Sequence, residues 1–128
     1  MKNLEGKIVV VTGAGSGIGR ALALQLAAQG AQLALCDVNE TNLQKTVEIA
    51  SAHGVKVYSA ALDVSKRDAF QTFADNVARA LGNASVIINN AGVALSQNVE
   101  GMDRKDFEWV LNINFWGVVN GCEAFLPQ

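Results

Sequence analysis

Short apolar runs alternate with amphipathic stretches along the first part of the chain. Residues 7–12 form a continuous run rich in β-branched side chains, which predicts a strand buried on both faces of a parallel sheet. Residues 18–29 place leucines and alanines on one helical face, and Gly30 follows where a helix would end with a glycine. A second strand is predicted for residues 33–37.

The same alternation continues through the middle of the chain. Asn39 can cap a helix that has one apolar face and ends at Gly54, and residues 55–61 form the third predicted strand. Ser65 and Asp68 then have the three-residue spacing of a capping box, with Asp in the position where Glu is usual. This pair predicts the start of a third helix.

The last part of the chain completes the pattern. The third helix carries an apolar stripe that stops at Gly82, and residues 85–89 predict a fourth strand. A last helix is expected from near Asp103 towards Pro127.

The predicted element order is therefore βαβαβαβα, with short connections and a single proline. Strands that alternate with helices in this way form a parallel sheet with helices on both faces. Right-handed crossovers then lead to a doubly wound, Rossmann-like α/β fold. We expect one domain over residues 1–128, truncated after the fourth strand and its following helix.

Composition narrows the functional classes. The chain has 128 residues, half of them hydrophobic, and a formal net charge of -2, which is typical of one soluble globular domain. No block of lysine and arginine indicates a nucleic-acid or membrane surface, and no apolar run has the length of a signal peptide or a membrane span. We expect a cytoplasmic protein with neither nucleic acid nor membrane as a partner.

The cysteines and the single histidine do not indicate a metal site. Cys36 and Cys122 lie far apart and lack the spacing of a zinc site, so reduced, buried thiols are expected. His53 precedes Gly54 at an exposed-looking helix end, which favours a surface role over catalysis. We predict that the chain binds no metal.

The segment TGAGSGIG, residues 12–19, lies between the first strand and the first helix. It lacks the lysine of a P-loop, and Ile18 stands where the common dinucleotide pattern G-x-G-x-x-G requires glycine. What remains is T-G-x-x-x-G-x-G, whose glycines let the backbone approach a ligand while the helix start offers unpaired N–H groups to a phosphate. A structural turn without a ligand is the alternative.

Five segments in this order resemble the N-terminal part of the short-chain dehydrogenase/reductase family. They are TGAGSGIG at 12–19, Asp37 at the end of the second strand, LDV at 62–64, NNAG at 89–92 and LNINFWG at 111–117. The resemblance implies a nicotinamide cofactor and hydride transfer to or from an alcohol or carbonyl carbon. A methyltransferase on a similar sheet is disfavoured, because it would have no reason to carry NNAG and LNINFWG.

The resemblance also implies which residues bind the dinucleotide. They are Gly13, Gly15, Ser16, Gly17, Ile18, Gly19, Asp37, Asp63, Val64, Asn90, Ala91 and Gly92. An acid at the position of Asp37 can bond the adenosine ribose hydroxyls, and its charge would repel a 2′-phosphate. Because Ser16 also stands where NADP-preferring relatives often carry a basic residue, NAD is expected over NADP.

Each of these residues also has a structural alternative. Asp37 could begin a turn over residues 37–39, and Asp63 could be a turn former instead of a reader of the adenine ring. Asn90, expected beside the ribose near the nicotinamide, could tie neighbouring strands together through its amide. For the asparagine both roles can hold at once.

Asn114 is the one catalytic residue that the resemblance implies. It shares an apolar helical face with Phe107, Val110, Leu111 and Val118, where an amide is costly unless it has partners. In the family the matching asparagine disturbs the helix and helps to hold a water in a proton relay. A buried structural asparagine is the alternative.

The family's chemistry also needs a serine and a Tyr-x-x-x-Lys pair that this chain lacks. Tyr58 is the only tyrosine, it belongs to the third predicted strand, and Leu62 stands four residues later. A phenol of ordinary pKa is a poor base without a nearby cation. We expect the chain alone to be inactive, with an alcohol or carbonyl substrate only in a completed enzyme. A non-enzymatic dinucleotide-binding or interaction module is the alternative.

The last predicted helix is apolar on more than one side. Two tryptophans, at positions 109 and 116, form a second surface beside a broad apolar stripe. The members of the stripe are Phe107, Val110, Leu111, Phe115, Val118, Cys122 and Phe125. One face can cover the sheet, so the other needs a different cover. In the family this helix pairs with its equivalent in a neighbouring subunit, and we therefore expect a homo-oligomer formed through the last helix. Cover by further segments of the same chain, and aggregation through the unpaired edge of the fourth strand, are the alternatives.

Overall fold

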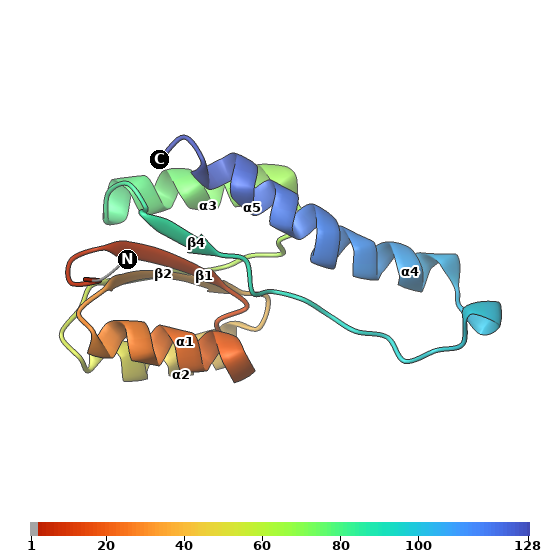
Figure 1. Cartoon of the computed structure of the whole chain (residues 1–128), viewed down its shortest axis with the longest axis horizontal. Helices are drawn as coiled ribbons and strands as arrows, with labels where there is room; N and C mark the ends of the chain where they lie inside the picture. Colours follow the sequence, from red (N-terminus) through yellow and green to blue (C-terminus); the bar gives the residue numbers. More distant parts are fainter. Residues whose placement is uncertain (1–2) are drawn as a thin grey trace.

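The computed structural model describes residues 3–128 and contains one four-stranded parallel sheet in the order β3-β2-β1-β4 (Figure 1). The strands are β1 (Ile8–Thr12), β2 (Gln32–Asp37), β3 (Val57–Ala61) and β4 (Val86–Ile88). In the register of the sheet, Thr12 pairs with Cys36 and Asp37 with Ala61, so the carboxyl ends of the strands share one edge. The predicted doubly wound α/β fold is confirmed.

Helices cover both faces of the sheet. Helices α1 (Gly17–Ala28) and α2 (Glu40–Ser51) lie on one face, and α3 (Arg67–Ala80) and α5 (Gly117–Phe125) lie on the other (Figure 1). The central strand serves both cores by alternation: Val9 and Val11 belong to the core under α1 and α2, and Val10 to the core under α3. All three valines are buried, as expected for a strand covered on both sides.

The predicted helix ends agree with the structure at most positions. Gly30 follows α1 with a φ of 87°, a left-handed conformation that glycine adopts without strain. Asn39 caps α2, because its side-chain oxygen accepts a 2.9 Å hydrogen bond from the Asn42 N–H.

The capping box predicted for Ser65 and Asp68 is wrong. Helix α3 begins one residue later than that box requires, after Lys66, which makes no side-chain cap. Ser65 instead donates both its N–H and its hydroxyl to Asp63 Oδ1, at 3.0 and 2.6 Å. The turn formed by Asp63 therefore engages the serine that a capping box would have used.

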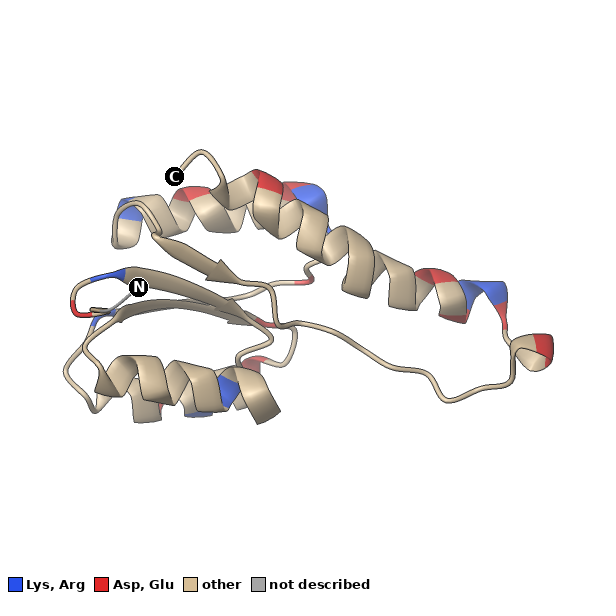
Figure 2. Ribbon diagram, in the orientation of Figure 1, with Lys and Arg blue, Asp and Glu red and all other residues tan. Residues whose placement is uncertain are grey.

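The last predicted helix is continuous but not uniform. It consists of α4 (Arg104–Leu111), a π-helical segment η2 (Asn112–Trp116) and α5, after a single 3₁₀ turn η1 (Val99–Gly101). Figure 1 shows α5 lying over the sheet, whereas α4 projects beyond it at the end of a long excursion from β4. No charged residue occurs between Glu108 and Glu123, which leaves the middle of this helix uncharged in Figure 2.

The side of this helix that packs on the sheet differs from the predicted stripe. The buried positions of α5 are Gly117, Asn120, Gly121, Ala124 and Phe125. A Cβ on Gly117 would lie 2.7 Å from Val64 Cγ2, and one on Gly121 would collide with Asn89 Oδ1. Small residues thus let the helix approach the sheet. Most of the predicted stripe is exposed: Phe107, Leu111, Phe115 and Val118.

The expectation of two buried cysteines is confirmed for one of them. Cys36, on β2, is buried, and burial together with the neighbouring Asp37 charge raises the pKa of its thiol to about 12. Cys122, on α5, is exposed, and the expectation is wrong for it. It lies beside the edge strand β4, where no further element within residues 3–128 covers it, and its Sγ accepts a 3.7 Å hydrogen bond from Asn89 Nδ2.

Candidate functional site

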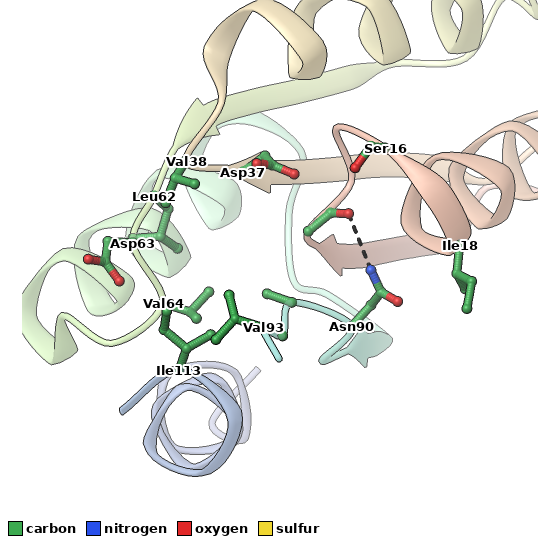
Figure 3. Close-up of a pocket in the computed structure, with 13 residues that line it drawn as sticks. Ser16, Ile18, Asp37, Val38, Leu62, Asp63, Val64, Asn90, Val93 and Ile113 are labelled. Carbon is green, nitrogen blue, oxygen red and sulfur yellow. Dashed lines mark hydrogen bonds between the residues drawn. The ribbon is translucent and has the colours of Figure 1, made fainter. Parts of the chain in front are cut away.

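A cavity of about 370 Å³ opens at the carboxyl edge of the sheet, beside the ends of β1, β2 and β4. From β1 the chain moves outward to β2 and β3 in one direction and returns to place β4 on the other side, so the cavity lies where the strand order reverses. Ligands of open α/β sheets bind at such a point. Its lining residues are Gly13, Ser16, Ile18, Asp37, Val38, Leu62, Asp63, Val64, Asn90, Ala91, Gly92, Val93 and Ile113 (Figure 3).

Nine of the predicted cofactor-binding residues are therefore brought together. The three that do not line the cavity are Gly15, Gly17 and Gly19, which belong to the loop behind it and to the start of α1. Figure 3 shows Val64, Val93 and Ile113 directed toward one another at one end of the cavity, while Asp37 and Ser16 lie at the other. The site thus has an apolar end and a polar end.

The loop between β1 and α1 leads into a helix start that has the features of an anion site. Ser16 occupies the N-cap of α1 but makes no side-chain cap, and the first turn of this helix contains no acidic residue. The first N–H groups of a helix have no acceptor within it, and they carry the positive end of the helix dipole. These groups are therefore available to a phosphate.

Two glycines, one in this loop and one in the first turn of α1, are required by close approach of the backbone. A Cβ on Gly13, which has a φ of 65°, would lie 2.9 Å from the Ala91 Cα. A Cβ on Gly19 would collide with the Gly13 carbonyl oxygen and would lie 2.6 Å from Asn90 Nδ2. Both positions let the loop, α1 and the end of β4 meet with no space for a side chain.

Asp37 is held by two backbone groups. Its Oδ2 accepts a 2.8 Å hydrogen bond from the Gly15 N–H, and its Oδ1 accepts a 3.0 Å bond from the Asn39 N–H. The second bond is the turn that was the structural alternative for this residue. Since Asp37 also lines the cavity, it forms that turn and presents a fixed carboxylate to a ligand.

The segment after β3 is tied in a similar way. Asp63 accepts both bonds from Ser65, and Asn120 Nδ2, which is buried on α5, donates a 2.9 Å hydrogen bond to the Val64 carbonyl. The turn role considered for Asp63 is therefore present. These bonds leave Asp63 Oδ2 and the Val64 N–H without a partner within residues 3–128, both at the cavity.

Asn90 joins the end of β4 to the loop after β1. Its Nδ2 donates to the carbonyl oxygens of Thr12 and Gly13, at 3.1 and 3.2 Å (Figure 3). Thr12 Oγ1 in turn accepts hydrogen bonds from the backbone N–H groups of Asn90 and Ala91, both at 3.0 Å. The strand-tying role considered for NNAG is thus present, and it fixes the floor of the cavity.

Asn114 lies in η2 and does not line the cavity. It is exposed rather than buried, and its amide is satisfied by the Val93 backbone: Oδ1 accepts from the Val93 N–H at 2.8 Å, and Nδ2 donates to the Val93 carbonyl at 2.7 Å. The helix is π-helical at this residue, and a π-helical turn of this kind is frequent at functional sites. Ile113, its neighbour, reaches the cavity.

Sequence reasoning missed three residues that hold the loop. Thr12 is buried, and Arg20 and Thr46 together bond the carbonyl oxygens of Ala14 and Gly15. Thr12 and Arg20 flank the glycine segment directly, so their position was a signal. Thr46 lies in the middle of α2, where nothing in the sequence points to the loop.

Other candidate chemistry lies elsewhere or is absent. Tyr58 is half-buried in β3 and packs against Phe73, with ring centroids 5.9 Å apart, so it does not reach the cavity. Residues 3–128 contain no cluster of His, Cys, Asp and Glu that could hold a metal ion. Over the same residues, no helix is long and apolar enough to cross a membrane.

The chain is similar in sequence to a known family over nearly its whole length. The family described as short chain dehydrogenase matches residues 7–128. The chain is 50% identical over 128 residues to a protein of Mycobacterium tuberculosis (strain ATCC 25618 / H37Rv) named "Putative oxidoreductase SadH", and covers 46% of that protein. It therefore spans about half the length of the curated relatives it matches.

Solved structures give the same result. The chain superposes with a TM-score of 0.95 and 38% identity on a short chain dehydrogenase/reductase from Burkholderia phymatum in complex with NAD, covering 99% of this chain and 45% of that one. It also matches an alcohol dehydrogenase from Thermococcus sibiricus complexed with 5-hydroxy-NADP, with a TM-score of 0.91, 34% identity, and coverage of 94% and 52%. The two matched structures hold different nicotinamide dinucleotides.

Proposed function

Because this chain belongs to the short-chain dehydrogenase family, we propose that residues 1–128 are the dinucleotide-binding domain of an NAD(P)-dependent oxidoreductase. The observation that carries the proposal is the cavity at the strand-order reversal, which joins an anion site at the start of α1 to a fixed carboxylate on β2. A dinucleotide needs both features, one for its pyrophosphate and one for a ribose.

Successive parts of a dinucleotide can each be assigned to residues of the cavity. The start of α1 would bind the pyrophosphate, and Asp37 would accept hydrogen bonds from the adenosine ribose. Asp63 Oδ2 and the Val64 N–H would read the adenine edge, because the hydrogen bonds among residues 3–128 leave these two groups free. Asn90, Ala91 and Gly92 would border the ribose at the nicotinamide end.

We further propose that the cofactor is NAD rather than NADP. The carboxylate of Asp37 is held in place by the N–H groups of Gly15 and Asn39, so it cannot turn away from a 2′-phosphate without losing both bonds. The carboxylate and a 2′-phosphate bound in the same cavity would repel each other, and Ser16, which also lines the cavity, supplies no positive charge to offset this. Titration of the chain with NADH and NADPH tests this, and equal or reversed affinities would refute it.

Asn114 is proposed as the catalytic residue of this half. Bound nicotinamide would supply the hydride chemistry, and the proposed part of Asn114 is to help hold a water in a proton relay. Its side chain bonds both backbone groups of Val93 and so holds the irregular helix at η2 in place, which Asn114→Ala would undo. In a longer polypeptide with the serine and the Tyr-x-x-x-Lys pair, Asn114→Ala should lower kcat more than cofactor affinity. An unchanged kcat in a folded variant would exclude the role.

The substrate of a completed enzyme is proposed to be a small alcohol or carbonyl compound. The chain alone is expected to show no turnover, because its one tyrosine is packed in β3 against Phe73. A non-enzymatic dinucleotide-binding module is the alternative. Supplying NADH and a carbonyl substrate to the chain by itself distinguishes turnover from binding, and turnover would contradict the expected inactivity.

We also propose that the protein is a cytoplasmic homo-oligomer. An exposed apolar surface along α4, η2 and the start of α5 supports association through the last helix. Its members are Phe107, Trp109, Leu111, Phe115, Trp116 and Val118. An apolar patch of this extent on one helix is a mark of an interface. Neither nucleic acid nor a membrane is proposed as a partner.

A further inference from the structure

Every backbone polar group of Ala14 and Gly15 has a hydrogen-bond partner within the chain. The Ala14 N–H donates to the Cys36 carbonyl at 3.0 Å, and the Gly15 N–H donates to Asp37 Oδ2 at 2.8 Å. The two carbonyl oxygens are bonded by side chains of α1 and α2. Ala14 accepts from Thr46 Oγ1 at 2.8 Å, and Gly15 accepts from Arg20 Nη2 at 2.6 Å.

Arg20 and Thr46 act as one unit. Arg20 Nη2 also donates to the Asn42 carbonyl at 2.9 Å, and its Nε donates to Thr46 Oγ1 at 2.9 Å. A threonine hydroxyl has one hydrogen, and the Ala14 oxygen is nearer to Thr46 Oγ1 than the Asn42 oxygen, which lies at 3.4 Å. The Thr46 hydroxyl therefore accepts a hydrogen bond from Arg20 Nε and donates one to the Ala14 carbonyl oxygen.

This arrangement decides which dipoles face a bound anion. A phosphate is stabilised by N–H groups that point at it and is repelled by carbonyl oxygens that do the same. Since Arg20 and Thr46 hold the carbonyls of Ala14 and Gly15 on the side of α2, the first turn of α1 presents its N–H groups without opposing oxygens.

The charge of Arg20 fits the same role. Arg20 is half-buried in the first turn of α1, where a cation is unfavourable next to the positive end of the helix dipole. It forms no ion pair with a carboxylate within residues 3–128. An anion bound at the start of α1 would relieve this excess of positive charge.

We propose that Arg20 and Thr46 are positioning residues that set the affinity of this site for the pyrophosphate of its ligand. The inference rests on the proposed function, because it assumes a ligand with phosphates. It concerns two residues that do not line the cavity, so their effect must pass through the loop. A purely structural role would weaken all ligands alike, whereas the positioning role weakens those with phosphates.

The test uses ADP and adenosine as paired probes, with dissociation constants measured by ligand-detected NMR. Thr46→Val keeps the shape of the side chain and removes the hydroxyl, and Arg20→Met removes the guanidinium. Matched controls on α3 are Thr72→Val and Arg79→Met, whose side chains bond only carbonyls of their own helix. Thr46→Ser, which keeps the hydroxyl, is the conservative variant.

We expect Thr46→Val and Arg20→Met each to weaken ADP about tenfold, the size of a lost hydrogen bond to a charged partner, and adenosine by less than about twofold. Thr46→Ser and the controls on α3 should bind ADP as the parent chain does. Equal weakening of ADP and adenosine, or unchanged ADP binding in a folded variant, would overturn the inference.

Two further outcomes are decisive. Should Thr46→Val and Arg20→Met fail to fold, Arg20→Lys carries the test, because lysine keeps the charge but cannot reach Gly15, Asn42 and Thr46 together. Its ADP affinity should then fall while its adenosine affinity stays, and an unchanged ratio counts against the inference. A parent chain that binds neither NADH nor ADP overturns the proposed function as well, which separates the two failures.

Discussion

The glycine loop and the projecting helix α4 differ in how completely this chain satisfies them. At the loop, the polar groups of Ala14, Gly15, Asp37 and Asn90 are bonded by neighbours within the chain. Along α4 and η2, aromatic side chains such as Phe115 and Trp116 stay 54% and 52% exposed and contact each other. The polar groups of the loop therefore have partners within the chain, whereas the apolar side chains of the projecting helix remain exposed.

The largest effect on stability and NADH binding is expected from a substitution at Gly19, where α1 meets the glycine loop. Gly19→Ala introduces a Cβ that collides with the Gly13 carbonyl oxygen, so the loop and α1 must separate. We expect an unfolding free energy lower by about 1–3 kcal/mol, as for other overpacked sites, and loss of detectable NADH binding. Thermal unfolding and NADH titration check both. Gly101→Ala is the control, because its Cβ would meet nothing within 4 Å.

A substitution at Asp37 should have a smaller effect, on the preference between NAD and NADP. Asp37→Ser removes the charge that faces a 2′-phosphate and shortens the group that holds the Gly15 N–H. The ratio of NADPH to NADH affinity should rise about tenfold, or about 1.4 kcal/mol. Fluorescence titrations with the two reduced cofactors measure this ratio, and a ratio that stays at the parent value would count against the assigned role of Asp37.

The sequence predicted the structure around the glycine loop more completely than the structure of the projecting helix. Glycine spacing, the Asn39 cap and the apolar runs predicted every strand and the edge where the cavity lies, because these signals are local. The hydrogen bond from Thr46 to the Ala14 carbonyl joins residues 32 positions apart, and no local sequence pattern predicts it.

The wrong prediction for the last helix has an identifiable cause. The apolar stripe of the last helix was expected on the sheet, but η2 changes the helical phase, and small residues at 117 and 121 pack there instead. Periodicity of 3.6 residues cannot anticipate a π-helical turn.

Substitutions on the projecting helix should change the association of the chain and leave its stability nearly unchanged. Replacing Trp109 and Trp116 together by glutamine removes the largest exposed members of the apolar face, and the unfolding free energy should change by less than about 0.5 kcal/mol because both lie at the surface. Sedimentation velocity at several concentrations should show association by the parent chain and a monomer for the variant. A parent chain that is monomeric at every concentration would refute the proposed association.

The smallest effect concerns the two thiols. The exposed Cys122 should react with a thiol reagent at neutral pH, and Cys36 only after unfolding. The raised pKa of Cys36, about 12 against an ordinary 9.0, means that the unfolded chain loses this proton first as pH rises. Its contribution to stability is therefore fully present below pH 9 and falls between pH 9 and 12. Rapid labelling of Cys36 in the folded chain would contradict its burial.

The central claim is that the start of α1 binds the pyrophosphate of a nicotinamide dinucleotide within this chain. Amide chemical shifts measured by NMR during titration with NADH test it most directly. The account predicts large shifts for the N–H groups of residues 16–19 and much smaller ones along α4. Unchanged shifts at residues 16–19 under saturating NADH, or changes confined to the last helix, would contradict it.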